Sequence, residues 1–416
     1  MDNIIDDLNY RGLIEQYSNE ASVHKLLDTK QTIYCGFDPS ASSMHLGNFV
    51  MISILMRLQR AGHRIIAVVG GATGMIGDPS GKSKERNLQN KETLAANTAS
   101  IKSQLERFLD LSDPEKGIIV NNYDWLGHME TLDFLRDYGK YFSINYMLSK
   151  EIVASRLEAG ISFTEFSYQI LQSIDFYTLN KKYGCKIQIG GNDQWGNLTS
   201  GMELIRKLDG ENAECEVMTA HLITRADGKK FGKSEDGALF LDQKLTSPYK
   251  LYQYFINCTD EDAVKYLKVF TFLSHDEIEA VAKDHFDHPG MRIAQKKLAY
   301  EVTKEIHGQA AADEAVKMSE VLFNGDVRSL TESEIEELLG TLKVKLDAPK
   351  NLADLLIAVG AAPSKTQART FIEQKGVSVN GVLADDPNKV YGLEDTLCGK
   401  YLIVRRGKKN YYLAVL

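Results

Sequence analysis

The sequence predicts an α/β fold, doubly wound around a parallel sheet, followed by a helical domain and a small α+β domain. Three observations support this class. Strand-like and helix-like segments alternate through the first half of the chain, residues 247–340 show helical patterns without a strand, and residues 350–416 combine two short helices with hairpin signals. Alternation of the first kind favours helices packed on both faces of a parallel sheet.

The first half supplies the segments for this sheet. Its strand-like runs are 33–37, 64–69 and 185–189, and its helical runs are 49–59 and 198–208. The run at 64–69 is almost continuously apolar, which suits a strand buried on both faces. Strand, helix and strand within about 40 residues make a βαβ unit. We therefore expect a Rossmann-like nucleotide-binding catalytic domain at residues 1–222, with a helical insertion.

Helix-start signals mark the middle of the chain. Ser247-Pro248 is a good N-cap and first-turn pair, and capping boxes begin at Ser274 and Thr331. We expect a helical domain at 223–340 and a linker with little pattern at 341–349.

Residues 350–416 look like a compact unit. A short helix ends at Gly360, and a second begins at Ser364, where Gln367 completes a capping box. Asn380-Gly381 is a strong hairpin signal, and a further hairpin surrounds the basic turn 405–409. This arrangement predicts a domain that folds independently of the rest.

Composition excludes several classes of protein. Of 416 residues, 43% are hydrophobic and 25% are charged, as in soluble globular proteins. No uncharged apolar run is long enough to span a membrane, and the N-terminus lacks a signal-peptide pattern. The five cysteines are scattered without a CxxC pair, which favours a reducing cytoplasm and argues against a zinc site.

Charge is unevenly distributed. Residues 350–416 contain ten Lys or Arg and six Asp or Glu, a net charge of +4, while the preceding residues carry −12. A polyanion would therefore meet the basic tail first, although a solvated surface explains this excess equally well.

A first motif, Asp38-Pro39-Ser40 through Met44-His45-Leu46-Gly47-Asn48, opens a helix. His45 and Asn48 are three residues apart and project from one face, beside free N–H groups and a positive helix dipole that suit a phosphate. Gly47 would let an adenine ring approach the backbone closely. Taken alone, the motif also fits an ordinary capped helix.

A second motif, 227–234, places Lys230 and Lys233 three residues apart on a glycine-containing loop, where they could neutralise a leaving pyrophosphate. A solvated basic turn is the plain alternative. A third loop, 70–83, invites comparison with a P-loop, but its spacing is one residue short and Pro79 removes an N–H from the cradle. Lys82 and Arg86 could still contact phosphates.

Together, in this order, the first two motifs resemble the HIGH and KMSKS signatures of class I aminoacyl-tRNA synthetases. Asn48 replaces the last histidine, and Phe231-Gly232 replaces Met-Ser. The strings 34–39, 70–82, 163–168 and 190–197 are similar to those of bacterial-type tyrosyl-tRNA synthetases, and the tail resembles an S4-type RNA-binding domain. The resemblance runs from about Leu8 to Leu416.

This resemblance implies a tyrosine–tRNA ligase that uses ATP with Mg²⁺ as substrate, no tightly bound cofactor, and tRNA(Tyr) as partner of a cytoplasmic homodimer that does not enter a membrane. The implied catalytic residues are His45, Asn48, Lys230, Lys233, Ser234, Lys82 and Arg86. The implied tyrosine-binding residues are Tyr34, Asp78, Tyr168, Gln172, Asp175 and Gln194. The implied ATP-binding residues are Gly36, Asp38, His45, Gly47, Asn48, Gly191, Asp193, Lys230 and Lys233. For tRNA they are Lys365, Arg369, Arg405, Arg406, Lys408 and Lys409.

The spacing of one group agrees with this assignment. Tyr168, Gln172 and Asp175 fall at i, i+4 and i+7 of a helical run and so share one face, which could equally be a polar surface. Three alternatives remain open: a tryptophanyl-type synthetase, a non-catalytic RNA-binding paralogue, and an NAD-dependent oxidoreductase. The last would need G-x-G-x-x-G after a strand, which the turn at 38–48 lacks.

Overall fold

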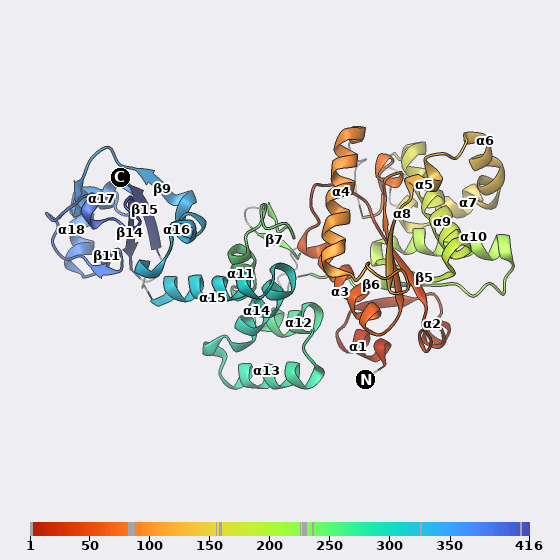
Figure 1. Cartoon of the computed structure of the whole chain (residues 1–416), viewed down its shortest axis with the longest axis horizontal. Coiled ribbons are helices and arrows are strands. Elements are labelled where there is room, and N and C mark those ends of the chain that lie inside the picture. Colours follow the sequence, from red (N-terminus) through yellow and green to blue (C-terminus); the bar gives the residue numbers. More distant parts are fainter. Residues whose placement is uncertain are drawn as a thin grey trace. The chain divides into compact units, whose positions relative to one another are not determined.

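The chain forms two compact units in a computed structural model (Figure 1). The first unit contains Met1–Thr246 and Thr259–Ala294, and the second contains Ser247–Cys258 and Gln295–Leu416. The structure describes residues 3–81, 88–154, 156–157, 160–224, 226, 231–234, 237–324, 327–407 and 410–416.

A six-stranded sheet is the centre of the first unit, with strand order β1-β6-β5-β2-β3-β4. Its strands are β1 (Ile14–Tyr17), β2 (Thr32–Phe37), β3 (Arg64–Val69), β4 (Gly117–Asn121), β5 (Cys185–Gly191) and β6 (Glu216–Ala220). All neighbours are parallel except β1, which is antiparallel to β6. The chain moves outward from β2 to β4 on one side and from β5 to β6 on the other. The order therefore reverses between β2 and β5, where such sheets bind ligands.

The strands predicted at 33–37, 64–69 and 185–189 are confirmed as β2, β3 and β5. β3 fits its apolar sequence, because residues 65–69 are all buried. Sequence reasoning did not anticipate β1, β4 or β6.

Helices cover both faces of this sheet, so the doubly wound architecture is confirmed (Figure 1). The helices α3 (Leu46–Arg60) and α4 (Lys91–Phe108) lie on one face, and α9 (Phe163–Tyr183) and α10 (Trp195–Asp209) lie on the other. Tyr34 and Ile66 of the sheet pack with Phe176 of α9 and Leu198 of α10 in one buried cluster.

The expected helical insertion follows β4. It contains α5 (Tyr123–Leu126), α6 (Thr131–Asp133), a π-helical turn η2 (Phe134–Tyr138), α7 (Ile144–Ser149) and α8 (Glu151–Ala154). Its apolar side chains pack against Ile170 and Ile174 of α9 and Leu204 of α10.

Four further helices complete the first unit: α1 (Ile4–Tyr10), α2 (Glu20–Leu27), α12 (Asp260–Phe270) and α13 (His275–Asp287). The predicted capping box at Ser274 is present at the start of α13. Among the described residues, no helix is long and apolar enough to cross a membrane.

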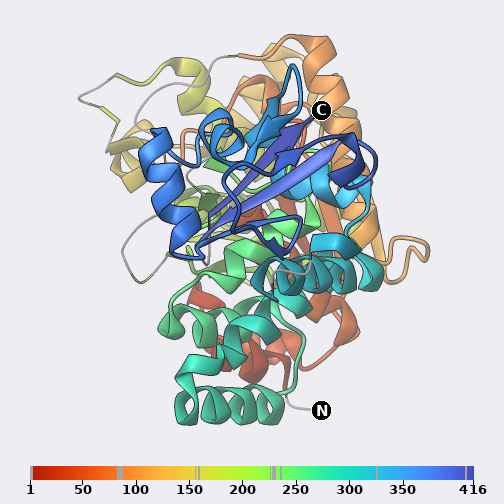
Figure 2. The same ribbon diagram turned by 90° about the vertical axis from the view of Figure 1, so that its left-hand side faces the viewer.

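The second unit joins helices to a small sheet. Its helices are α11 (Pro248–Ile256), α14 (Ile293–His307), α15 (Gln309–Asn324), α16 (Glu332–Leu339), α17 (Leu352–Ala358) and α18 (Lys365–Glu373). Its five-stranded sheet has the order β12-β11-β14-β15-β9, from β9 (Lys343–Lys345), β11 (Val377–Val379), β12 (Val382–Leu383), β14 (Tyr401–Arg406) and β15 (Asn410–Val415). Figure 2 presents the blue strands of this sheet toward the viewer.

Local signals in this unit also agree with the structure. Ser247 caps α11, and Thr331 forms the predicted capping box with Glu334. Asn380 and Gly381 both have positive φ, as the turn of the β11–β12 hairpin requires. Ser364 caps α18 by accepting a hydrogen bond from the Gln367 N–H at 3.3 Å, but the bond from the Ser364 N–H to the Gln367 side chain that a capping box requires is absent from the described residues.

The domain boundaries differ from those expected. Helices α12 and α13 belong to the first unit rather than to a separate helical domain at 223–340. Within the expected linker 341–349, Lys343–Lys345 form β9, which pairs in parallel with β15. Residues 350–416 also pack against the residues before them, because Tyr401, Ile403 and Leu413 lie in one cluster with Val321 and Leu339. The register of β9 and this cluster depend on long-range contacts that local sequence patterns do not contain.

Candidate functional site

A cavity of about 780 Å³ opens at the carboxyl ends of the central strands of the first unit. Residues directly after β2, β3, β5 and β6 line it, together with the first turn of α3 and one face of α9. It therefore lies where the strand order reverses, and its volume suits a ligand the size of a nucleotide or small molecule.

The inner end of this cavity is a buried polar group. Asp175 on α9 is 4% exposed and accepts hydrogen bonds from Asn122 Nδ2 at 3.0 Å and Trp125 Nε1 at 2.8 Å. Burial raises the pKa of Asp175 to about 7, against the lowering effect of these two donors. The carboxylate has four lone-pair sites and so can accept further hydrogen bonds.

Tyr34 on β2 lies beside Asp175 in the cavity lining. Its ring is 1% exposed, and its hydroxyl oxygen is buried without a hydrogen-bond partner among the described residues. Burial, and then the charge of Asp175, hold the pKa of Tyr34 well above its usual value. Since a buried hydroxyl without a partner is costly, this atom points to a ligand with a polar group.

Asp78, which also lines the cavity, is held by several donors. Its carboxylate accepts from Gln194 Nε2 at 2.5 Å, from the Ser80 N–H at 3.0 Å and from Asn197 Nδ2 at 3.3 Å. These bonds fix a buried negative charge in one orientation, where it can attract a cation.

Asp38, which follows β2, organises a second part of the wall. It accepts hydrogen bonds from the Tyr168 hydroxyl and from the Thr73 hydroxyl, both at 2.8 Å. Burial, followed by the charges of Asp38 and Asp78, raises the pKa of Tyr168 well above its usual value, so this phenol stays protonated. Tyr168, Gln172 and Asp175 all line the cavity, which confirms that they share one face of α9.

The first signature segment (residues 44–48) lies at another side of the same cavity. His45 is the N-cap of α3, where its Nδ1 accepts from the Asn48 N–H at 3.3 Å, and Asn48 Oδ1 accepts from the His45 N–H at 3.0 Å. A Cβ on Gly47 would lie 2.9 Å from His45 Cε1, so only glycine fits without displacing the imidazole. A Cβ on Gly36 would meet open space, because this backbone faces the hollow.

The opposite lip contains Gly191, Asp193 and Gln194, all lining the cavity. A Cβ on Gly191 would lie 2.6 Å from Asp193 Oδ1, a separation that would displace this carboxylate. All six residues predicted to bind tyrosine line this cavity, together with the predicted ATP-binding residues outside the second signature segment, although they come from elements far apart in the sequence.

The second signature segment (residues 227–234) is described only in part. Phe231 lines the cavity, and Lys233-Ser234 form the short strand β7, which pairs with β8 (Gly237–Ala238). Lys230, Lys82 and Arg86 lie outside the described residues, as do Lys408 and Lys409 in the tail.

The basic residues of the tail differ in their surroundings. Lys365 forms an ion pair with Asp354 at 2.8 Å, and Arg369 is exposed on the same helix, α18. Arg406, in contrast, donates to the Ala361 carbonyl at 2.5 Å and stacks on Phe371 at 5.1 Å. Contacts of this kind hold the fold together, so Arg406 is less available to RNA than Arg369.

Sequence reasoning missed the residues that orient the buried carboxylates. Asn122 and Trp125 fix Asp175, Thr73 holds Asp38, and Asn197 supports Asp78. The available signal for Asn122 was its place directly after the apolar run 117–120, because polar residues at the carboxyl end of a strand often face a ligand.

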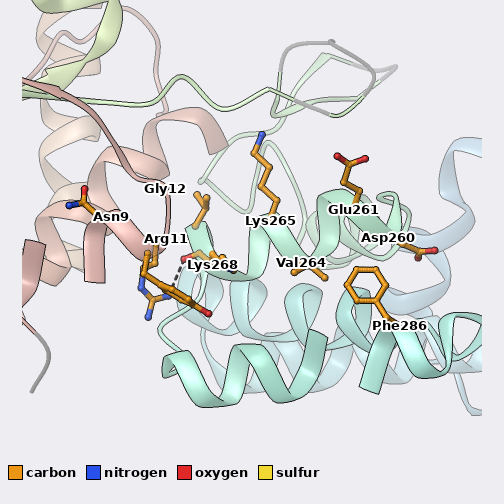
Figure 3. A pocket seen from close by; sticks show the side chains of 11 residues that line it. Asn9, Arg11, Gly12, Asp260, Glu261, Val264, Lys265, Lys268 and Phe286 are labelled. Carbon is orange, nitrogen blue, oxygen red and sulfur yellow. Dashed lines mark hydrogen bonds between the residues drawn. The ribbon is translucent and has the colours of Figure 1, made fainter. Parts of the chain in front are cut away.

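A second hollow in the first unit lies along α12, between residues 9–12 and α13 (Figure 3). Val264, Phe286, Lys265 and Lys268 are among its lining residues, and its lining is mostly apolar. None of its described lining residues has a buried polar atom without a partner comparable to the Tyr34 hydroxyl, so the cavity at the sheet is the candidate active site. In the part of the chain that the structure describes, no cluster of three His, Cys, Asp or Glu side chains could hold a metal ion.

A doubly wound sheet with a glycine-lined, polar cavity at its switch point defines a nucleotide-binding α/β enzyme. Comparison with known proteins identifies the family of this enzyme. Residues 27–324 match the family described as tRNA synthetases class I (W and Y), and residues 334–414 match the tyrosine–tRNA ligase SYY-like C-terminal domain. The chain is 50% identical to the tyrosine–tRNA ligase of Listeria monocytogenes over 414 residues and to that of Bacillus caldotenax over 416, covering 99% of each chain.

Comparison with solved structures agrees with this family match. A C-terminally truncated mitochondrial tyrosyl-tRNA synthetase of Aspergillus nidulans is 30% identical, with a TM-score of 0.70 over 78% of this chain and 95% of its own. A tryptophanyl-tRNA synthetase of Encephalitozoon cuniculi, at 14% identity and a TM-score of 0.55 over 79% of this chain and 89% of its own, shares the fold.

The chain belongs to the tyrosine–tRNA ligase family of class I aminoacyl-tRNA synthetases. It is an enzyme that activates L-tyrosine with ATP to tyrosyl-adenylate and pyrophosphate and then transfers the tyrosyl group to the 3′ end of tRNA(Tyr). The tryptophanyl, non-catalytic and oxidoreductase alternatives are thereby set aside.

Proposed function

We propose that tyrosine binds with its phenol at the inner end of the cavity and its amino-acid end toward Asp78. The observation that carries this orientation is the buried Tyr34 hydroxyl without a partner, next to the Asp175 carboxylate with acceptor sites to spare. The substrate phenol donates to Asp175 and hydrogen-bonds the Tyr34 hydroxyl. Phenylalanine would leave both groups unpaired, which is unfavourable in a buried site.

The α-ammonium group is held by Asp78, Tyr168 and Gln172. Asp78 supplies the charge, since its position is fixed by Gln194 and Asn197. The Tyr168 hydroxyl donates a hydrogen bond to Asp38 at 2.8 Å, which leaves an oxygen lone pair to accept from the ammonium group.

ATP occupies the part of the cavity between the first signature segment and the lip at 191–194. Gly36, Gly47 and Gly191 allow the nucleotide close to the backbone, and Asp38 and Asp193 are placed to bind its sugar and base. The N-terminus of α3, a helix of 15 residues, offers positive dipole to the phosphates.

The reaction needs no nucleophile from the protein. A carboxylate oxygen of tyrosine attacks the α-phosphorus of ATP, and the bond to pyrophosphate breaks. His45 and Asn48 steady the α-phosphate in the transition state, while Lys230, Lys233, Ser234, Lys82 and Arg86 neutralise the leaving pyrophosphate. A hydroxyl at the 3′ end of the tRNA then attacks the carbonyl carbon, and AMP leaves. Mg²⁺ would bind with ATP through its phosphates, not through a dedicated set of protein ligands.

Three broader properties belong to the same proposal. The chain acts as a homodimer through the helical insertion and the start of α9, where Leu132 (76% exposed), Ile144 (60%) and Phe163 (72%) present apolar side chains. It works in the cytoplasm, which suits its five free cysteines. The tail meets tRNA through Lys365, Arg369, Arg405, Lys408 and Lys409, with Arg406 supporting them.

Tyrosine-dependent ATP–pyrophosphate exchange tests the binding mode. The wild-type protein should catalyse exchange with tyrosine and not with the other nineteen amino acids, and Asp175→Ala should abolish it. Asp28 is exposed and lies in the same unit, so Asp28→Ala is the matched control and should retain exchange. Normal tyrosine exchange by Asp175→Ala would show that the phenol binds elsewhere.

A further inference from the structure

The second signature segment is anchored by residues outside it. Residues 227–230 lie outside the described part of the chain, but the residues on both sides, Ala226 and Phe231-Gly232, are described. Each of them contacts α12 or the start of α3, so the described residues on both sides of 227–230 are held against these two helices.

Asp262 anchors the entering side. It occupies the first turn of α12, is 3% exposed, and accepts from the Ala226 N–H at 3.0 Å through Oδ1 and 3.3 Å through Oδ2. The Thr259 hydroxyl caps the same helix by accepting from the Asp262 N–H at 3.2 Å. A nearby contact supports the anchor, because Lys265 Nζ donates to the Thr224 carbonyl at 3.1 Å. A buried carboxylate that accepts a backbone N–H makes a strong, directional bond.

An aromatic stack anchors the leaving side. Phe231 is 8% exposed, and its ring lies 4.8 Å from Phe270 in a stacked arrangement and 4.9 Å from Tyr266 edge-on. Phe270 stacks in turn on Phe49, at 6.5 Å. Phe49 directly follows Asn48 of the first signature segment, so three rings connect the two signature segments.

Main-chain hydrogen bonds connect the same two segments. The Leu239 N–H donates to the Gly232 carbonyl at 2.9 Å, and the Leu46 N–H donates to the Leu239 carbonyl at 2.8 Å. Gly232 has φ +74°, and a Cβ there would lie 3.4 Å from the Gly47 nitrogen. Glycine is therefore required by the backbone conformation at this position, which explains its presence in the motif.

Helix α12 is itself held in place, as Figure 3 shows for Arg11 and Lys268. Arg11 donates to the carbonyls of Lys268 and Thr271 at 3.0 Å and of Leu273 at 2.7 Å. Arg57 of α3 also donates to the Thr271 carbonyl, at 2.5 Å. These bonds hold the carboxyl end of α12 and the turn after it, and they tie the helix to α3, whose N-cap is His45.

We propose that Asp262 and Phe270 are positioning residues for adenylate formation: they touch no substrate, and they fix the ends of the second signature segment against α12. The inference rests on the proposed role of Lys233 in neutralising pyrophosphate. Because that role requires a precise placement of the segment only in the transition state, loosening either anchor lowers the rate of adenylate formation and leaves tyrosine binding unchanged.

Single-turnover kinetics of the full-length protein test the proposal. Asp262→Ala should lower the rate of tyrosyl-adenylate formation at saturating ATP and tyrosine by roughly ten-fold, the effect of one charge-assisted hydrogen bond. Asp262→Asn keeps an acceptor oxygen and should restore the rate to within about three-fold of wild type. Glu261→Ala removes the same charge from the same helix turn at an exposed position and should leave the rate unchanged. Phe270→Leu should behave like Asp262→Ala.

A second measurement separates positioning from damage to the fold. The tyrosine dissociation constant should be unchanged in all four variants, because none of the proposed tyrosine-binding residues lies on α12. Asp262→Ala should lower the rate of adenylate formation much less in the Lys233→Ala background than in wild type, because both substitutions act through the same segment.

The outcomes are distinct. A normal rate for Lys233→Ala would overturn the proposed function of the segment. A large effect of Lys233→Ala with a normal rate for Asp262→Ala would overturn only the anchoring role. Equal losses in the rate and in tyrosine affinity for Asp262→Ala, or full additivity with Lys233→Ala, would show general damage and also reject positioning.

Discussion

Replacing Asp175 by asparagine should stabilise the first unit and disable tyrosine recognition. Burial raises the pKa of Asp175 from 3.8 to about 7. Below pH 3.8 the carboxyl is protonated in both the folded and the unfolded chain, so its ionisation does not change the free energy of unfolding. As the pH rises, the unfolded chain ionises first, so the folded state loses stability until the pH passes 7.

The magnitude follows from this shift. The full penalty is about 4 kcal/mol above pH 7, and about 3 kcal/mol of it develops between pH 5 and pH 8. The asparagine variant avoids this penalty. Its amide oxygen can still accept from Trp125, but its amide nitrogen then faces the Asn122 donor, at a cost of about 1–3 kcal/mol. The variant should therefore gain about 1–3 kcal/mol at pH 8 and little or nothing at pH 5.

Urea unfolding followed by tryptophan fluorescence measures this, because both tryptophans, Trp125 and Trp195, lie in the first unit. Asp110→Asn is the control: hydrogen bonds from Lys116 and Ser112 lower the pKa of Asp110 to about 2, so its effect should be the same at both pH values. An Asp175→Asn effect that does not change between pH 5 and pH 8 would refute the reasoning. Stabilisation at pH 8 together with lost tyrosine activation would indicate an active site maintained at the expense of stability.

Four further predictions concern the reaction and the assembly. Lys233→Ala should lower the rate of adenylate formation roughly a hundred-fold while changing tyrosine affinity little, as stopped-flow measurements would show; a loss of affinity alone would contradict a transition-state role. Tyr34→Phe should reduce the preference for tyrosine over phenylalanine in pyrophosphate exchange by roughly ten-fold, and an unchanged preference would remove Tyr34 from the phenol site. Phe163→Asp should shift sedimentation toward the 46.5 kDa monomer, whereas a wild-type protein that is already monomeric would disprove the dimer. Removal of residues 325–416 should retain pyrophosphate exchange and abolish tRNA charging. Truncation at 325 separates fewer packed residues of the second unit than truncation at 350. Intact charging by the truncated protein would show that the tail does not anchor tRNA.

Local signals in the sequence were sufficient for much of the fold. The apolar run 64–69 became a buried central strand, and Ser274 and Thr331 formed the predicted capping boxes. Asn380-Gly381 formed the predicted hairpin turn. Each of these features depends on neighbours within a few residues, so the chain specifies them without reference to the rest of the fold. The periodicity of α9 likewise placed Tyr168, Gln172 and Asp175 on one face.

Tertiary structure alone decided the features that depend on distant contacts. The three short strands β1, β4 and β6 were not predicted from the sequence, and the structure defines them by their pairing with neighbouring strands. β9 joined the C-terminal sheet because β15 offered it an open edge, although its own sequence looked like a linker.

The electrostatics of the site were decided in the same way. The sequence by itself placed Asp175 and Tyr34 at positions that match the motifs of tyrosyl-tRNA synthetases, and this resemblance suggested their roles. Only the folded chain buries Asp175 under Asn122 and Trp125 and leaves the Tyr34 hydroxyl without a partner. The pKa of a carboxyl group depends on its burial and on the donors around it, and both donors here, Asn122 and Trp125 at α5, lie about 50 residues before Asp175 in the chain. No local pattern contains that information.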